Sequence, residues 1–179
     1  MVQHIASRAR RGEKPRGLRP TAARTLESVF DMLQGEIEGR TVLDLFAGTG
    51  AFGIVALKKN ASLAVFADSA REAQRRIHKA LEQYHLEERA IVCHEDVFHF
   101  LNRVSKDGRT YDIIFADPPY GLYPMAKMIE AIFDARVLAP GGVLVFEHSK
   151  REAPPECPGL VLRRSRVFGD TTISIFDFS

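Results

Sequence analysis

The chain contains 179 residues, of which 45% are hydrophobic and 27% are charged, a composition typical of a soluble globular protein. This length suits one compact domain, no apolar run approaches the roughly 18 residues of a membrane span, and no signal-peptide core follows the N-terminus. The two cysteines, Cys93 and Cys157, show no metal-ligand spacing. We therefore expect a reduced, cytoplasmic protein with no metal site and no membrane partner.

The N-terminal segment is basic, although the net charge of the whole chain is only +2. Residues 1–20 contain six Lys or Arg residues and a single acid, Glu13. A basic arm on a mildly acidic body suggests contact with a polyanion, whereas the charge alone fits a solvated tail equally well. The predicted organisation is a basic N-terminal arm over residues 1–19 and a single domain over residues 20–179.

Helices and strands alternate after the arm. The first helix opens at Pro20 and carries an apolar stripe at helical spacing, formed by Leu26, Val29, Phe30 and Leu33. Ser69 and Glu72 predict a capping box at the start of a later helix. Apolar segments predict strands at about 41–46, 63–67, 90–93, 111–116, 143–146, 160–168 and 171–178.

The order of these elements predicts the fold class. Strands that alternate with helices predict an α/β protein with a doubly wound, mostly parallel sheet. The last two strands are separated only by Gly169 and Asp170, which fit a two-residue hairpin turn. We therefore expect a mostly parallel sheet that is closed by a C-terminal antiparallel hairpin.

A glycine turn follows the first strand. Gly48, Gly50 and Gly53 spell the G-x-G-x-x-G dinucleotide fingerprint, and Asp68 lies at about the expected distance, so a nicotinamide or flavin enzyme is one interpretation. Asp44 argues against it, because a carboxylate just before the turn would repel a pyrophosphate. The same carboxylate suits a ligand that carries an ammonium and a sulfonium, such as S-adenosylmethionine (SAM).

Aspartates follow four successive predicted strands: Asp44, Asp68, Asp96 and Asp117. Ligands of such sheets bind at the carboxyl ends of the strands, so we expect one shared site. Asp68 would accept hydrogen bonds from both ribose hydroxyls, or would act as a helix N-terminal acid beside Ser69. Asp96 would accept from an adenine amino group while the Val97 N–H donates to the ring, or would be a plain helix cap.

The tetrapeptide Asp117-Pro118-Pro119-Tyr120 follows the fourth predicted strand. An exocyclic amine such as N2 of guanine is a poor nucleophile with two N–H donors, which the Asp117 carboxylate and the Pro118 carbonyl could accept. The two prolines restrict the backbone, and Tyr120 offers a face on which a base could stack. An ordinary proline-rich turn is the alternative for the tetrapeptide alone, but its pairing with the glycine turn favours amine methylation over the dinucleotide interpretation.

Together these motifs resemble the SAM-dependent amino-methyltransferases with a (Asp/Asn)-Pro-Pro-(Tyr/Phe) motif, and more narrowly the RsmD-type bacterial 16S ribosomal RNA guanine-N2 methyltransferases. The narrow resemblance rests on the segments 17–21 with Arg24, 44–51 and 168–171. It implies a Rossmann-like methyltransferase fold and SAM as the cofactor. The cofactor-binding residues expected from the motifs are Asp44, Phe46, Ala47, Gly48, Thr49, Gly50, Asp68, Ser69, Asp96 and Val97.

The resemblance also implies the acceptor and its contacts. The expected activity is methyl transfer to N2 of one guanine in 16S ribosomal RNA, within a partly assembled small subunit, by a monomeric protein. Asp117, Pro118 and Tyr120 are the expected catalytic residues. The residues expected to hold RNA are Arg19, Thr21, Arg24 and Tyr120.

Some positions depart from the family pattern. Leu26 stands where a second arginine is expected, and Asp68 replaces the commoner glutamate. One alternative therefore keeps the chemistry with another amine, in DNA adenine, in other RNA or in protein. A second alternative is a catalytically silent RNA-binding assembly factor.

Overall fold

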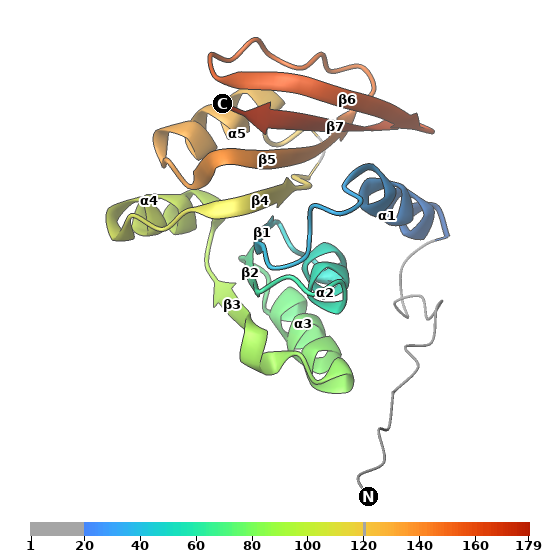
Figure 1. Ribbon diagram of the computed structural model, residues 1–179, viewed down its shortest axis with the longest axis vertical. Helices are drawn as coiled ribbons and strands as arrows, with labels where there is room; N and C mark the ends of the chain where they lie inside the picture. The colour runs from blue at the N-terminus through green and yellow to red at the C-terminus, as the bar shows by residue number, and fades with distance from the viewer. Residues whose placement is uncertain (1–19, 120) are drawn as a thin grey trace, which may run out of the picture.

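A computed structural model of the chain describes residues 20–119 and 121–179, with side chains from residue 23 onward (Figure 1). The predicted basic arm, Arg19, Tyr120 and the side chain of Thr21 therefore lie outside the described residues. Within the described part, no helix is both long and apolar enough to cross a membrane.

The strands of the described residues form one seven-stranded sheet in the order β3-β2-β1-β4-β5-β7-β6. The first five strands are parallel to one another, and β7 runs antiparallel to both β5 and β6. The strands are β1 Thr41–Leu45, β2 Leu63–Asp68, β3 Ala90–His94, β4 Tyr111–Ala116, β5 Leu138–Ser149, β6 Leu160–Phe168 and β7 Thr171–Phe178. This arrangement confirms the predicted α/β class and the closing hairpin.

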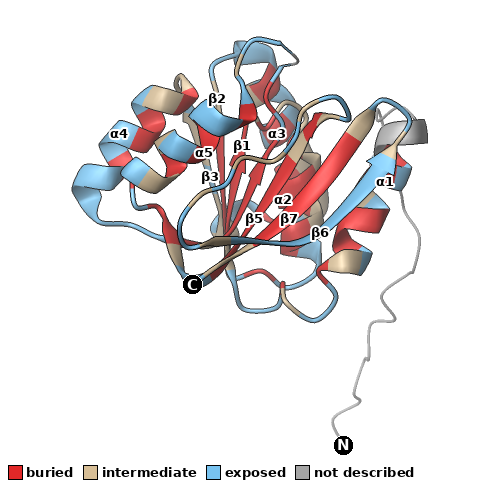
Figure 2. Cartoon of the chain, turned by 90° about the horizontal axis from the view of Figure 1, so that it is seen from above, coloured by how far each residue is buried: buried red, intermediate tan, exposed pale blue. Residues whose placement is uncertain are grey.

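Helices cover both faces of the sheet (Figure 1). On one face lie α1 Pro20–Met32, α2 Ala51–Lys58 and α3 Arg71–Tyr84, and on the other lie α4 Val97–Asp107 and α5 Met125–Asp134. A short 3-10 turn, Glu87–Arg89, precedes β3. Because both faces are covered, the central strands are buried on both sides, as Figure 2 shows.

The amphipathic helices α1 and α3 bury their apolar sides. Val29 and Phe30 of α1, and Leu33 directly after it, are at most 4% exposed, so the predicted stripe packs on the core. In α3, Ile77 and Leu81 are buried while the intervening polar residues face solvent. Burying one such side chain contributes about 1.5–3 kcal/mol, so packing rather than helix propensity holds these helices in place.

Two local predictions were wrong. The N-cap of α3 is Ala70, which makes no side-chain cap bond, and Glu72 instead pairs with Arg75 and Arg76 one turn along the helix. The fifth strand begins at Leu138 rather than Val143, because the pairing of β4 with β5 continues past an irregularity in register between Tyr111 and Ile113. The hairpin was predicted correctly, since Gly169 has φ +63° in a two-residue connection between β6 and β7.

Candidate functional site

The site lies at the carboxyl ends of the parallel strands, next to the boundary between β1 and β4. From β1 the chain continues outward to β2 and β3 on one side of this boundary, and it then returns to β4 and β5 on the other side. Ligands of doubly wound sheets bind at this point. The structure brings the strand-end residues Asp44, Asp68, Asp96 and Asp117 to this edge, as predicted. Three neighbouring cavities surround them.

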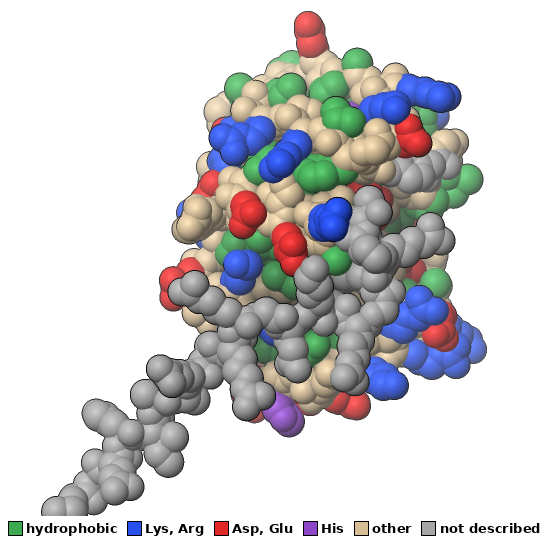
Figure 3. All heavy atoms as spheres, turned by 90° about the vertical axis from the view of Figure 1, so that its right-hand side faces the viewer, with side chains coloured by type: hydrophobic (Ala, Val, Ile, Leu, Met, Phe, Trp, Pro, Cys, Tyr) green, Lys and Arg blue, Asp and Glu red, His purple; other side chains and the backbone are tan. Residues whose placement is uncertain are grey.

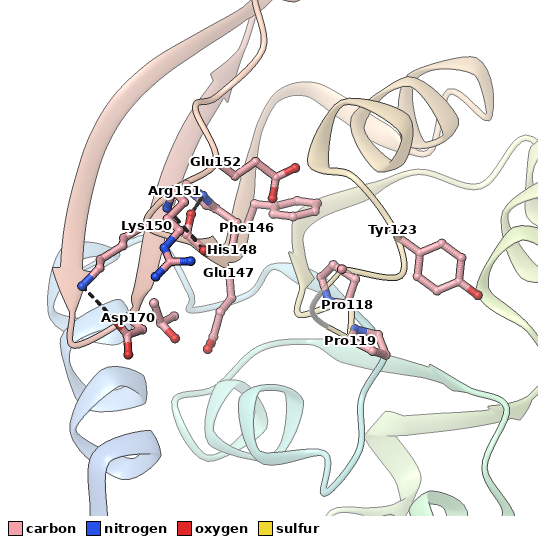
Figure 4. A pocket seen from close by; sticks show the side chains of 13 residues that line it. Pro118, Pro119, Tyr123, Phe146, Glu147, His148, Lys150, Arg151, Glu152 and Asp170 are labelled. Atoms are coloured by element: carbon pink, nitrogen blue, oxygen red, sulfur yellow. Dashed lines mark hydrogen bonds and ion pairs between the residues drawn. The ribbon is translucent and has the colours of Figure 1, made fainter.

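We name the cavities by the strands that wall them. The β1 cavity, about 270 Å³, is lined by Asp44, the glycine turn, Asp117 and Glu147. The β2–β3 cavity, about 500 Å³, is lined by Asp68, Ser69, Asp96, Val97 and Tyr123. The β5 cavity, about 470 Å³, is lined by Pro118, Pro119 and the residues that follow Phe146 (Figure 4).

The glycine turn after β1 contains three residues in the left-handed backbone region. Gly48 and Gly50 have φ of +55° and +70°, and the non-glycine Phe46 has φ +57°. A left-handed non-glycine residue costs about 1–3 kcal/mol and is typical of functional sites. Gly53 has a different role, because a Cβ atom there would lie 2.3 Å from the Phe66 ring. The third glycine of the motif thus allows α2 to approach β2.

Asp44 is buried at the base of the turn, with 1% of its surface exposed. Its Oδ2 accepts a hydrogen bond from the Gly53 N–H at 3.0 Å, which joins the end of β1 to the first turn of α2. Burial raises the pKa of Asp44 well above its usual range, the bond from Gly53 opposes this shift, and the charges of Asp117 and Asp68 add to it. A cation bound in the β1 cavity would stabilise the ionised form.

Asp68 holds the turn from the other side. One carboxylate oxygen accepts from the Gly48 N–H at 2.8 Å, and the other accepts from the Ala70 N–H at 2.8 Å. This tie to Gly48 was not predicted from the sequence. Each oxygen still has a second lone pair, so the arrangement is compatible with the predicted hydroxyl contacts in the β2–β3 cavity.

Asp96 is the N-cap of α4. Its Oδ1 accepts from the N–H groups of Phe98 and His99, at 2.9 and 3.3 Å, so the helix-cap interpretation is confirmed. Asp96 and Val97 also line the β2–β3 cavity, so the second interpretation, a contact to an adenine edge, is compatible with the cap.

Aromatic side chains wall the β2–β3 cavity. The ring of Tyr123 lies 5.6 Å from that of Phe46 and 5.3 Å from that of Phe98, centroid to centroid. The rings of Phe46 and Tyr123 line the cavity together with Leu122 and offer an apolar surface suited to a flat heterocycle. Leu122 and Tyr123 were missed by the sequence analysis, because they lie in the connection before α5 and follow no periodic pattern.

The segment that follows β4 joins the three cavities. Asp117 lines the β1 and β2–β3 cavities, while Pro118 and Pro119 line the β2–β3 and β5 cavities. Although Asp117 is exposed toward the cavities, protein atoms crowd its carboxylate, and this desolvation raises its pKa to about 6. The group is therefore ionised at neutral pH and able to accept hydrogen bonds.

Further residues of the site, which the sequence did not single out as site residues, come from α1 and β5. Thr25, Leu26 and Val29 of α1 close the β1 cavity, and Glu147, two residues before the end of β5, lines both the β1 and the β5 cavities. The same strand-end rule that identified the four aspartates also points to Glu147, which directly follows the strand predicted at 143–146. Arg24, predicted to hold RNA, is exposed on α1 and is not among the lining residues of these three cavities.

The lining of the β1 cavity decides which ligand fits. Its described residues include the acids Asp44, Asp117 and Glu147 and no Lys, Arg or His. Carboxylates around a small cavity repel a pyrophosphate but attract an ammonium or a sulfonium. The residues therefore fit SAM and not a dinucleotide. Among the described residues, no cluster of His, Cys, Asp and Glu is arranged to hold a metal ion.

Known proteins resemble this chain over most of its length. The family model described as conserved hypothetical protein 95 matches residues 6–177. YlbH of Bacillus subtilis, which is named as an rRNA methyltransferase, is 31% identical over 159 residues, which cover 88% of this chain and 86% of YlbH. Ribosomal RNA small subunit methyltransferase D of Escherichia coli K12 is 29% identical over 161 residues, which cover 89% of this chain and 79% of that protein. The solved structure of yhhF from Escherichia coli superimposes with a TM-score of 0.81 at 27% identity, covering 93% of this chain and 91% of yhhF.

Proposed function

The chain belongs to the RsmD family, described as conserved hypothetical protein 95, and from this premise we propose that it transfers the methyl group of SAM to the N2 amine of a guanine in 16S ribosomal RNA. Family membership supports the coarser statement, SAM-dependent methylation of ribosomal RNA. The observation that carries the acceptor chemistry is the position of Asp117 and Pro118, between the acidic β1 cavity and the β5 cavity.

The proposed cofactor site combines two of the cavities. When bound, SAM supplies a methyl group that its positive sulfonium has already activated. Asp44 in the β1 cavity would attract the cationic methionine portion, while Asp68 and Asp96 would accept hydrogen bonds from the adenosine portion in the β2–β3 cavity. Phe46 and Tyr123 would give the adenine ring an apolar surface.

The proposed acceptor site uses the end of β4. The Asp117 carboxylate and the Pro118 carbonyl would each accept one N–H of the amine, which directs the nitrogen lone pair toward the methyl group. After transfer the nitrogen must lose one proton. With its pKa raised to about 6, the Asp117 carboxylate is able to take that proton at neutral pH.

The proposed substrate is the 16S RNA of a partly assembled small subunit, acted on by a monomer. The target base must leave its stack to reach the cavities, as for other base-modifying enzymes. Figure 3 shows Lys and Arg side chains interspersed with Asp and Glu on one face of the molecule. RNA contacts are proposed for Arg19, Thr21, Arg24, Tyr120 and the basic arm, which would bind phosphates without reading sequence.

The test is transfer of labelled methyl from SAM to unmodified small ribosomal subunits, followed by nucleoside analysis of the digested RNA. Label in N2-methylguanosine is the expected result. Label in another nucleoside would preserve methyl transfer and refute the guanine-N2 assignment. No label, with SAM binding intact by calorimetry, would refute an RNA acceptor.

A further inference from the structure

Glu147 lies beside Asp117 at the edge of the sheet. The last paired positions of β4 and β5 are Ala116 and Phe146, whose side chains both face the α4–α5 side. Since side chains alternate along a strand, the next residues, Asp117 and Glu147, both face the α1 side, and both line the β1 cavity. Two carboxylates from neighbouring strands thus point to the same region.

Glu147 also faces the β5 cavity, on the side of Asp117 away from the adenosine residues. Figure 4 shows Glu147 and Tyr123 on opposite sides of Pro118 and Pro119, with Glu147 and the two prolines lining the same cavity. Glu147 is therefore the carboxylate that lines both the cavity assigned to the methionine portion and the cavity that opens toward the acceptor.

The backbone that carries Glu147 is held firmly. Glu147 pairs with Ile173 of β7 in the antiparallel ladder. The next residue, His148, is 4% exposed, and its Nε2 lies 2.8 Å from the Ser174 hydroxyl while its Nδ1 lies 2.9 Å from the Ser149 carbonyl oxygen. A side chain carried by such a well-held strand is suited to recognising the edge of a base.

We propose that Glu147 selects guanine by accepting the N1–H of the target base, an inference that rests on the proposed function and deepens it. The edge of guanine that carries N2 presents three donors in a row: N1–H and the two N2–H groups. The sheet edge presents three acceptors: Glu147, the Asp117 carboxylate and the Pro118 carbonyl. Adenine and cytosine each present a ring-nitrogen lone pair next to their amine, and this lone pair would oppose the Glu147 carboxylate.

The test separates the N1–H contact from any effect on the cofactor. Small subunits are reconstituted with guanine, or with 2-aminopurine, at the nucleotide that the labelling experiment identifies. 2-Aminopurine keeps the amine at C2 but has a lone pair instead of a hydrogen at N1. The variants are Glu147→Leu, which removes the acceptor, and Glu147→Gln, which preserves the shape of the side chain.

We expect Glu147→Leu to lower kcat/KM on guanine roughly 10- to 100-fold, as for loss of a charged hydrogen bond. On 2-aminopurine we expect kcat/KM to stay the same or rise, because the N1 lone pair no longer faces a carboxylate. We expect Glu147→Gln to lower kcat/KM on guanine less than Glu147→Leu does, since the amide oxygen of glutamine can still accept a hydrogen bond from N1–H. Glu130→Gln, on the exposed side of α5, is the matched control and should leave both substrates unaffected. Equal losses on both bases, or no loss on guanine, would overturn the proposal.

These outcomes are distinct from failure of the proposed function. If the unaltered protein forms no N2-methylguanosine, the proposed function fails before any variant is compared. If it forms N2-methylguanosine and the variants show no dependence on the base, the reaction stands and the role of Glu147 is wrong. Thermal unfolding of each variant shows whether a loss reflects folding.

Discussion

Asp68 and Gly48 are joined by a hydrogen bond of 2.8 Å from the Gly48 N–H to the Asp68 carboxylate, which ties the end of β2 to the glycine turn that follows β1. The residue predicted to contact the cofactor thus also holds the loop around it. The Asp68 side chain therefore both fixes the conformation of the glycine turn and lines the β2–β3 cavity.

Replacing Asp68 should therefore affect both stability and binding. In Asp68→Ala the N–H groups of Gly48 and Ala70 lose their partner, so we expect the free energy of unfolding to fall by about 1–3 kcal/mol. SAM affinity, measured by calorimetry, should fall roughly 10- to 100-fold. Asp68→Asn should reduce stability and SAM affinity less than Asp68→Ala does. Glu88→Ala, which removes an exposed acid, is the control. An Asp68→Ala variant as stable as the parent would show that the hydrogen bond between Gly48 and Asp68 does not stabilise the fold.

The contact between Gly53 and Phe66 predicts a coupled pair of substitutions. Gly53→Ala places a Cβ atom 2.3 Å from the Phe66 ring, so we expect destabilisation of about 1–3 kcal/mol in chemical denaturation. Phe66→Leu makes room, so the double variant should lose less than the sum of the two single variants. Strict additivity would show that the helix does not press on this ring.

The pKa of Asp117 predicts the pH dependence of activity. The carboxylate must be ionised to accept the amine hydrogens, and its pKa is raised to about 6. Activity should therefore be low below pH 6, rise through it and level off above it, with kcat/KM reporting the free protein. Asp117→Asn should reduce turnover by at least about 100-fold and remove the dependence near pH 6. A profile flat from pH 5 to pH 8 in the parent protein would refute this role.

The same pKa predicts an effect of opposite sign on stability. Because the folded protein binds the Asp117 proton more tightly than the unfolded chain does, the contribution of this group to stability is full below about pH 4 and is lost as the pH rises through 6. Asp117→Asn should therefore raise Tm at pH 8 but not at pH 4. Since the carboxylate is open to cavity water, we expect a gain of about 1 kcal/mol or less, roughly 2–4 °C. An equal change in Tm at both pH values would argue against a raised pKa.

Much of the fold followed from local patterns. The apolar stripe of α1, the buried parallel strands and the Gly169-Asp170 hairpin were predicted correctly, because periodicity and turn residues act over short distances. The capping box at Ser69 and Glu72 failed for an equally local reason: Glu72 can reach Arg75 and Arg76 on its own helix, and the chain enters α3 through Ala70.

The sequence by itself determined that a glycine turn and four aspartates stand at strand ends, because strands, turns and caps are encoded by neighbouring residues. Only the tertiary structure decided which side chains share a cavity. Glu147 lies next to Asp117 because β5 pairs with β4, and Tyr123 reaches Phe46 because the connection to α5 folds back over the glycine turn. The order of the strands and the paths of the loops depend on how helices pack on both faces of the sheet. This packing is a sum of contacts between residues far apart in the sequence, so no short segment is enough to predict it.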